Sequence, residues 1–182
     1  SSKVRRIDYS NDTATAVAKG PLSQTRSQNQ ATGNGDFGYI IGRHTTSAPS
    51  NTIDRIDYSN DTANASPKGS LTDSIYYGAA TGNTSSGYVG GGRQSPSSTG
   101  LSFVQRIDYS NDTAAAATKG PLTVGRKRLA AASSRAYAMP LKGPGNLEAP
   151  VSLGAFSRNL GPQGTDFGYF GGGSYPSVSS SK

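Results

Sequence analysis

The chain carries few side chains that could do acid/base or metal chemistry. His44 is the only histidine and cysteine is absent, so neither an imidazole pair nor a thiolate metal cluster can form. His44 stands in a linker-like stretch beside Thr45-Thr46-Ser47, where a solvated side chain is the default, and no local signature of a Ser/His/Asp nucleophile is present. We therefore expect a protein that is not an enzyme and has no catalytic residue.

Two short motifs look like ligand sites. Asp8-Tyr9-Ser10-Asn11-Asp12 gathers oxygen-bearing side chains as a calcium loop does, but no later bidentate carboxylate follows. The alternative is a turn stabilised by Asn11 and Asp12, with Asp8 paired to Arg6 or to a neighbouring unit. The stretch 33–38 matches G-x-G-x-x-G, yet a strand rather than a helix follows it. The sequence thus predicts no metal and no cofactor.

Several asparagines match the acceptor pattern for N-glycosylation, and three of them fall in the repeated triplet Asn-Asp-Thr. The five sites are Asn11, Asn60, Asn64, Asn83 and Asn111. In a secreted eukaryotic protein they would carry a regular row of sugars. In a phage protein made in bacterial cytoplasm they would stay bare, and the motif does not choose between the two.

A net charge of +7 is typical of proteins that bind nucleic acid, but the basic residues of this chain are mostly scattered. The exception is Arg126-Lys127-Arg128, a contact patch for an acidic glycan, lipopolysaccharide or a neighbouring subunit. Solvated surface charge explains the same residues. No nucleic-acid-binding module is visible, so we expect no nucleic acid partner.

The elements that position these residues follow from an internal repeat. The octapeptide Arg-Ile-Asp-Tyr-Ser-Asn-Asp-Thr occurs unaltered at 6–13, 55–62 and 106–113. A period of about fifty residues is typical of propeller blades and repeat arrays, in which each unit buries its apolar face against a neighbour. We expect one repeat domain over 1–182, with units at about 4–53, 54–104 and 105–182 and an irregular insertion at 130–164.

Alternation of apolar and polar residues predicts about four short antiparallel strands in each unit and no amphipathic helix. Phe37, Tyr39 and Ile41 would share one strand face. The fold class is therefore all-β, with antiparallel four-stranded blades that form a β-propeller or part of one. We expect the isoleucines and tyrosines of the octapeptides to occupy equivalent, largely buried strand positions: Ile7, Ile56, Ile107, Tyr9, Tyr58 and Tyr109.

The end of the chain is in phase with its beginning. The segment 171–182 is similar to the linker that precedes an octapeptide elsewhere, and 1–5 leads into the first octapeptide. Three units need not close a ring, and open strand edges invite pairing. We therefore expect a homo-oligomer or a part of a longer polypeptide; the alternative is self-closure, with 130–164 as a fourth blade. No apolar run is long enough for a membrane span.

The pattern resembles the kelch repeat. Gly90-Gly91-Gly92 and Gly171-Gly172-Gly173 are similar to the double glycine of that family, and Arg26 and Arg126 stand where kelch blades carry an arginine. The kelch tryptophan has no counterpart, and Ile75 or Tyr76 occupies the arginine region of the second unit. The resemblance implies kelch-like blades.

A closer resemblance is to the repetitive structural proteins of marine bacteriophages, especially those of cyanobacterial hosts. It rests on 54–62, on Lys119-Gly120-Pro121-Leu122 and on 166–173. The resemblance implies a structural or adhesive virion component, such as a tail, fibre or appendage protein. Its partners would be other virion proteins, further copies of itself or a host-surface glycan. The alternative is a secreted, N-glycosylated extracellular protein that binds carbohydrate or forms fibres.

Overall fold

The computed structural model describes residues 1–44, 49–94, 97, 99–133 and 168–174, and this part of the chain is all-β, without an α-helix. Its strands form two antiparallel four-stranded sheets flanked by two hairpins. We call these the N-terminal hairpin, the first sheet, the second sheet and the C-terminal hairpin. In that order their strands are β1 (Val4–Arg6) and β2 (Val17–Lys19); β3 (Gln30–Gly33), β4 (Phe37–His44), β5 (Pro49–Asp57) and β6 (Ser66–Pro67); β7 (Tyr76–Gly82), β8 (Ser86–Arg93), β9 (Val104–Asp108) and β10 (Ala117–Lys119); and β11 (Lys127–Ser133) and β12 (Gly168–Ser174).

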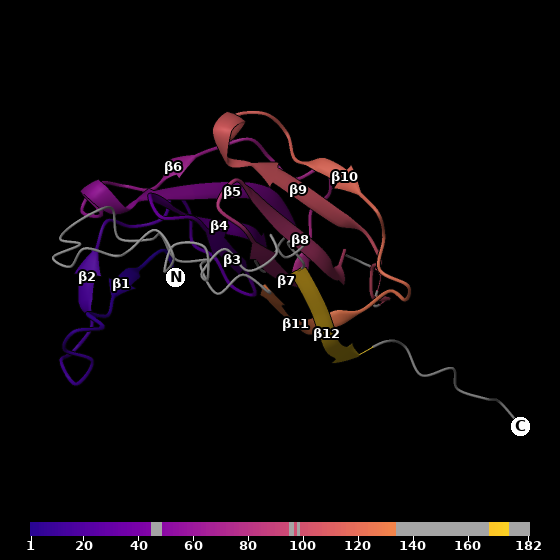
Figure 1. The fold of residues 1–182 in the computed structure, drawn as a ribbon, viewed down its shortest axis with the longest axis horizontal. Helices are drawn as coiled ribbons and strands as arrows, with labels where there is room; N and C mark the ends of the chain where they lie inside the picture. The colour runs from indigo at the N-terminus through magenta and orange to yellow at the C-terminus, as the bar shows by residue number, and fades with distance from the viewer. Residues whose placement is uncertain (45–48, 95–96, 98, 134–167, 175–182) are drawn as a thin grey trace, which may run out of the picture.

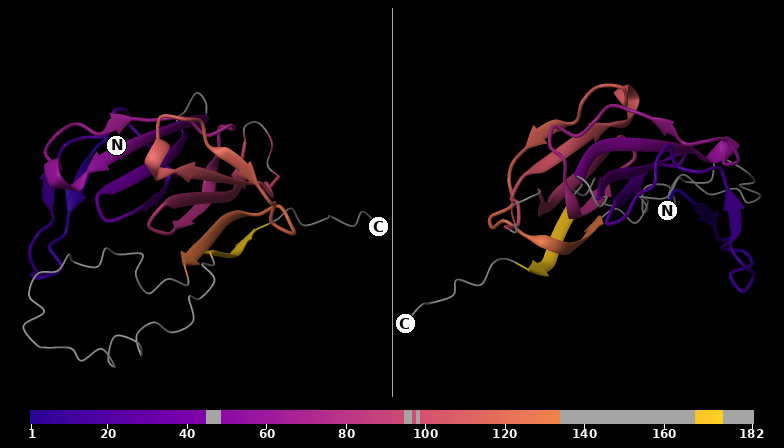
Figure 2. Two further views of the ribbon diagram at one scale, coloured as in Figure 1. Left: turned by 45° about the horizontal axis from the view of Figure 1, so that its top comes forward. Right: turned by 180° about the vertical axis from the view of Figure 1, so that it is seen from behind.

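The two hairpins lie at opposite ends of a row of sheets (Figures 1 and 2). β3 of the first sheet packs against β7 of the second, and β7 packs in turn against β11 of the C-terminal hairpin. Within each sheet the strands follow chain order as an antiparallel meander. The arrangement is therefore a stack of similar sheets, as the repeat in the sequence requires.

Each four-stranded sheet combines the second half of one sequence unit with the first half of the next. In the first sheet, β3 and β4 precede the second octapeptide, whereas β5 contains its beginning. The N-terminal hairpin, built on the first octapeptide, is therefore equivalent to the last two strands of a sheet. The C-terminal hairpin is equivalent to the first two strands of a sheet.

The same distortion of the backbone recurs at equivalent positions in the two sheets and the C-terminal hairpin. Gly42, Gly91 and Gly172 have φ of 69°, 64° and 70°, a left-handed conformation that glycine adopts without steric cost. The strand pairing between β4 and β5 shifts register between Ile41 and Arg43, as at a β-bulge. The glycine-rich strand ends singled out in the sequence thus serve to bend the strands.

The core lies between the first and second sheets. It consists of the buried residues Tyr39, Ile41, Ile53, Leu71, Ile75, Val89, Ile107, Tyr109 and Ala116. Tyr39 and Ile41 are fully buried on the strand face that alternation predicted, and Phe37 packs at their margin. Both sheets contribute, so neither could bury this surface alone.

The expectation that all octapeptide isoleucines and tyrosines are buried is wrong. Tyr109 is 8% exposed, Tyr58 50% and Tyr9 82%. The isoleucines follow the same order: Ile107 is buried, Ile56 is half-buried and Ile7 is exposed. Tyr58 and Tyr109 also begin short 3₁₀ helices rather than lying in strands.

The cause of this gradient is the neighbour, because the three octapeptides are identical. The third lies against a complete four-stranded sheet, the second against the N-terminal hairpin only, and the first forms that outermost hairpin itself. The isoleucine and tyrosine of an octapeptide are thus more buried when the preceding layer, meaning the sheet or hairpin before it in the stack, has more strands.

The described strands do not close into a ring, since β1 and β12 belong to different sheets. Of the expected insertion at 130–164, only 130–133 falls in the described part, within β11; the remainder and 175–182 lie outside it. Among the described residues no helix is long and apolar enough to span a membrane.

The burial gradient predicts different costs for one substitution in identical sequence contexts. Tyr109→Ala should lower the free energy of unfolding by about 3 kcal/mol, because it empties a packed aromatic site. Tyr9→Ala should change it by less than about 0.5 kcal/mol. Denaturant unfolding of both variants checks this, and equal costs would contradict the gradient.

Candidate interaction surface

Each octapeptide forms a turn held by its first aspartate. Asp8 Oδ1 accepts hydrogen bonds from Ser10 N (2.9 Å) and Ser10 Oγ (2.6 Å), and Asp57 and Asp108 do the same with Ser59 and Ser110. These hydrogen bonds hold the pKa values of the three carboxyls below their usual range. The sequence-based expectation that Asp8 pairs with Arg6 or a neighbouring unit is therefore wrong: Asp8 shapes its own turn.

The second aspartate of the octapeptide joins one layer to the next. Asp112 of the second sheet accepts from Arg55 (2.8 Å), Lys68 (3.4 Å) and the Tyr39 hydroxyl (3.0 Å), all on the first sheet. We call these contacts the second joint. The expected role of Asp12 as a turn stabiliser is accordingly wrong for its equivalents.

The first joint has the same design. Asp61 of the first sheet pairs with Arg6 (2.7 Å) and Lys19 (2.9 Å) of the N-terminal hairpin. The hydrogen bond and charge of Lys19, with those of Arg6, lower the pKa of Asp61. The tyrosine of the second joint has no counterpart here, because the N-terminal hairpin lacks the first two strands of a sheet.

A glycine brings the two backbones together at each joint. Gly20 N donates to Asp61 O (2.9 Å) and Gly69 N donates to Asp112 O (2.8 Å). A Cβ on Gly20 would overlap the carbonyl oxygen of Ala63, and a Cβ on Gly69 that of Ala114. The glycine of the Lys-Gly-Pro-Leu and Lys-Gly-Ser-Leu segments is thus required by a close approach.

The aromatic ring of the third octapeptide fills the space above the second joint. Tyr109 stacks on Tyr39 with ring centroids 4.7 Å apart, and its hydroxyl lies 2.9 Å from Thr32 Oγ1. Burial raises the pKa of Tyr109 to about 12. Burial, and then the hydrogen bond to Asp112, also raise the pKa of Tyr39.

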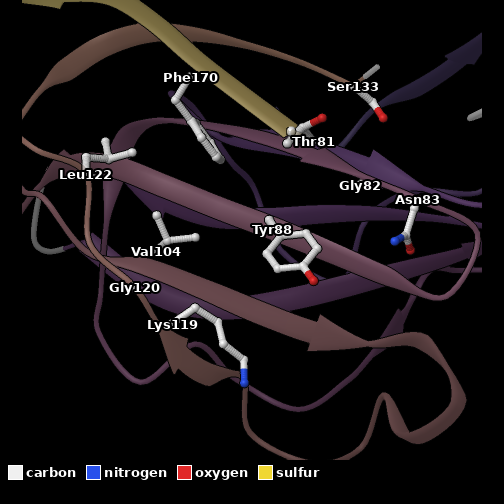
Figure 3. Close-up of a pocket in the computed structure, with 11 residues that line it drawn as sticks. Thr81, Gly82, Asn83, Tyr88, Val104, Lys119, Gly120, Leu122, Ser133 and Phe170 are labelled. Carbon is white, nitrogen blue, oxygen red and sulfur yellow. The ribbon is translucent and has the colours of Figure 1, made fainter. Parts of the chain in front are cut away.

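A cavity of about 380 Å³ opens on the far side of the second sheet, between that sheet and the C-terminal hairpin (Figure 3). Phe170 reaches into it from β12, and Val104, Tyr88 and Lys119 line the opposite wall (Figure 3). The described residues that line it are Thr81, Gly82, Asn83, Tyr88, Val104, Lys119, Gly120, Leu122, Ser133, Gly168 and Phe170. With apolar walls and a cation at its rim, the cavity suits an aromatic or aliphatic side chain beside a carboxylate.

The predicted glycosylation sites lie on turns. Asn11, Asn60 and Asn111 are exposed, and the Oδ1 of each accepts from the threonine two residues later. Asn64 is exposed as well. Asn83 differs, because its Oδ1 accepts from Ser85 and Ser86 within a tight turn at the cavity margin.

Two arginines of the predicted basic patch, Arg126 and Arg128, make contacts within the chain. Arg126 donates to Gly172 O (2.9 Å), and the guanidinium of Arg128 lies 4.7 Å from the centre of the Tyr77 ring. Lys127 begins β11 between them and is half-buried. The three do not line the cavity.

His44 is the last residue of β4. In the part of the chain that the structure describes, no three His, Cys, Asp or Glu side chains gather as metal ligands would. Sequence reasoning missed the joint residues Arg6, Lys19 and Asp61 and their equivalents. The signal was present, because Arg, Lys-Gly and the second Asp recur in all three units.

Comparison with known protein families finds no family model that matches the chain, and comparison with curated proteins finds no match either.

The second joint predicts a stability difference between two equivalent carboxylates. Asp112→Asn should lower the free energy of unfolding by about 2 kcal/mol, since it weakens bonds from two cations and a phenol. Asp12→Asn, which breaks no described contact, should stay within about 0.5 kcal/mol. Urea titration of both variants checks this; a cost for Asp12→Asn equal to that for Asp112→Asn would contradict it.

The raised pKa of Tyr109 predicts a loss of stability in alkali. The folded state holds the phenol proton of Tyr109 more tightly than the unfolded chain does. The stability that this proton provides is therefore fully present below pH 10.0 and is lost as the pH rises towards about 12. Between pH 10.0 and about 12, the free energy of unfolding should fall more steeply with pH for the wild type than for Tyr109→Phe. Parallel curves would contradict the assignment.

Proposed function

We propose that this chain is a structural or adhesive component of a virion, in a tail, fibre or appendage, that acts through contacts with proteins or glycans. The observation that carries the proposal is the repeated joint. In both described joints the charged side chains that recur in the octapeptides and Lys-Gly segments bind one layer to the next. The polar residues that recur in the repeats of such a chain join its layers, as in a structural protein.

A kelch-like blade is the finer description of each sheet that we propose. The support is the antiparallel four-stranded meander, the face-to-face stacking and the left-handed glycines at Gly91–Gly92 and Gly172–Gly173. The arginine that the resemblance pointed to, Arg26, is buried and pairs with Asp54 at 2.8 Å. A related array, open rather than closed, would serve a fibre or appendage.

The proposal of a non-enzymatic role rests on how the polar residues are used. The buried Asp54 and Asp112 pair with cations of the chain, and Gln105 accepts from Thr72. Among the described residues lining the cavity there is no carboxylate and no histidine. Lys119 and Tyr88 can exchange a proton, but neither has such a partner in that lining for acid/base catalysis.

One observation favours the alternative of a secreted, glycosylated surface protein. Asn11, Asn60 and Asn111 are all exposed on equivalent turns, so a sugar could be attached to each without displacing a packed side chain. Peptide mass spectrometry of the protein from its natural source distinguishes the two proposals. Sugars on these three residues would favour the secreted protein.

An antibody raised against the folded chain tests the virion proposal. Purified particles from the source material should contain peptides of the chain, and labelling in electron micrographs should fall on a tail, fibre or appendage. Treatment of particles with the antibody should reduce adsorption to host cells if the part is adhesive. Recovery of the protein only outside particles would refute the proposal.

A further inference from the structure

We propose that the cavity between the second sheet and the C-terminal hairpin is the seat for the N-terminal hairpin of a second copy of this chain, which completes a four-stranded sheet with β11 and β12. The occupant is the segment 4–19. This inference rests on the assembly part of the proposed function and names its partner; it does not depend on the virion setting.

Four residues of the cavity lining occupy positions equivalent to residues of the core between the first and second sheets. Equivalence follows from strand pairing: Tyr88 stands opposite Arg106 as Tyr39 stands opposite Arg55. Four cavity residues therefore correspond to four buried core residues. Tyr88, Val104, Leu122 and Phe170 are equivalent to Tyr39, Ile53, Leu71 and Val89.

The side chains that fill the inner surface have exposed counterparts in the N-terminal hairpin. Ile107 and Tyr109 complete the core, and Ile7 and Tyr9 are 54% and 82% exposed. Seated in the cavity, Tyr9 of the second copy would stack on Tyr88. Its hydroxyl would then face Thr81, the equivalent of Thr32.

The charges at the cavity match the same hairpin. Arg106 and Lys119 are equivalent to the cations of the second joint, and no carboxylate of the described residues lies within ion-pair distance of either. Asp12 is exposed and likewise has no ion pair among the described residues. The missing joint is completed when Asp12 of one copy meets Arg106 and Lys119 of another.

Gly120 differs from its two counterparts in what lies beside it. A Cβ on Gly20 or Gly69 would overlap a carbonyl oxygen of the next layer, but a Cβ on Gly120 meets no atom of the described residues within 4 Å. Gly120 is exposed, whereas Gly20 is buried. Ala63 and Ala114, whose carbonyl oxygens lie beside Gly20 and Gly69, correspond to Ala14 in the first unit. In the proposed assembly the Ala14 carbonyl of the second copy would lie beside Gly120.

The free strand edge sets the register. β4 pairs on both sides, with β3 and β5, and β8 pairs with β7 and β9, whereas in the described residues β12 pairs with β11 alone. Since Gly38 faces Ile56 and Gly87 faces Ile107, Gly168 would face Ile7 of the second copy. In the same register Gly171 would face Val4.

Two positions depart from the inner surface. Ser133 stands where the second sheet has Gly82, so the end of β11 must yield slightly to the incoming tyrosine. In the first sheet Asp54 pairs with Arg26. At the proposed contact the position of Asp54 is taken by Arg5 of the second copy. Arg5 would face Arg126, the equivalent of Arg26. The like charges make this joint weaker than the two within the chain.

The contact is heterologous, because one end of the chain binds the opposite end of the next. Copies would therefore form open filaments or rings rather than twofold dimers. A filament of stacked sheets fits the fibre or appendage role.

Two variants that each disable one side test the proposal. Asp12→Lys places a cation against Arg106 and Lys119, so its hairpin cannot seat, but its cavity is intact. Gly120→Ala blocks the cavity but leaves the hairpin intact and the fold unchanged. Gly69→Ala, the matched control at the filled joint, should instead destabilise the chain, since its Cβ overlaps Ala114.

Light scattering against concentration gives the readout, with 18.7 kDa as the monomer. The wild type should gain mass with concentration, each variant alone should associate at least tenfold more weakly, and an equimolar mixture should form a one-to-one dimer. Arg5→Asp should tighten wild-type association about tenfold, because it replaces the repulsion at Arg126 by an ion pair.

Crosslinking tests the register, since the chain has no native cysteine. A mixture of Val4→Cys and Gly171→Cys chains should form a disulfide-linked dimer on oxidation, and Arg6→Cys with Gly171→Cys should not. A wild type that stays monomeric, variants that still associate alone, or a mixture that stays monomeric would overturn the proposal. A monomer with Tyr9 buried would show self-closure instead. Absence from particles, with association intact, would refute only the virion role.

Discussion

The structure depends on one contact: a carboxylate of the second and of the third octapeptide that pairs with an arginine and a lysine of the preceding layer. The bond is charge-assisted and partly buried, so its geometry matters more than that of a surface ion pair. It is supported by a glycine whose missing side chain lets two backbones approach closely enough to bond. Together these fix the spacing and the rotation from one sheet to the next.

Apolar packing follows from that spacing. The sheets are short, with many glycines and alanines, and neither can bury its own face. At the joint distance, Tyr109 reaches across to Tyr39 and closes the core between two layers. Stability is therefore shared between neighbouring layers, as in other repeat proteins, and an outermost layer is expected to be the first to open.

The sequence was sufficient for the all-β class, the turns and the buried face of β4, because these follow from alternation and local turn chemistry. It did not predict burial of the octapeptides, since identical residues at Tyr9 and Tyr109 differ only in what lies in front of them. The sequence-based prediction also exchanged the roles of the two aspartates of the turn. Local spacing makes both Asp8 and Asp12 plausible turn residues. Only the stacked structure shows that the first aspartate of the octapeptide stabilises its own turn, whereas the second pairs with cations of the preceding layer.

The contact proposed at Gly120 has the same design as the two joints within the chain. Amide hydrogen exchange, measured residue by residue at low and high protein concentration, tests this equivalence directly. We expect slow exchange at Gly20 and Gly69 at every concentration, because their amides donate to Asp61 and Asp112. We expect fast exchange at Gly120 in dilute solution and protection of that amide as chains associate. Fast exchange at Gly69, or association that leaves the Gly120 amide unprotected, would contradict the equivalence of the joints.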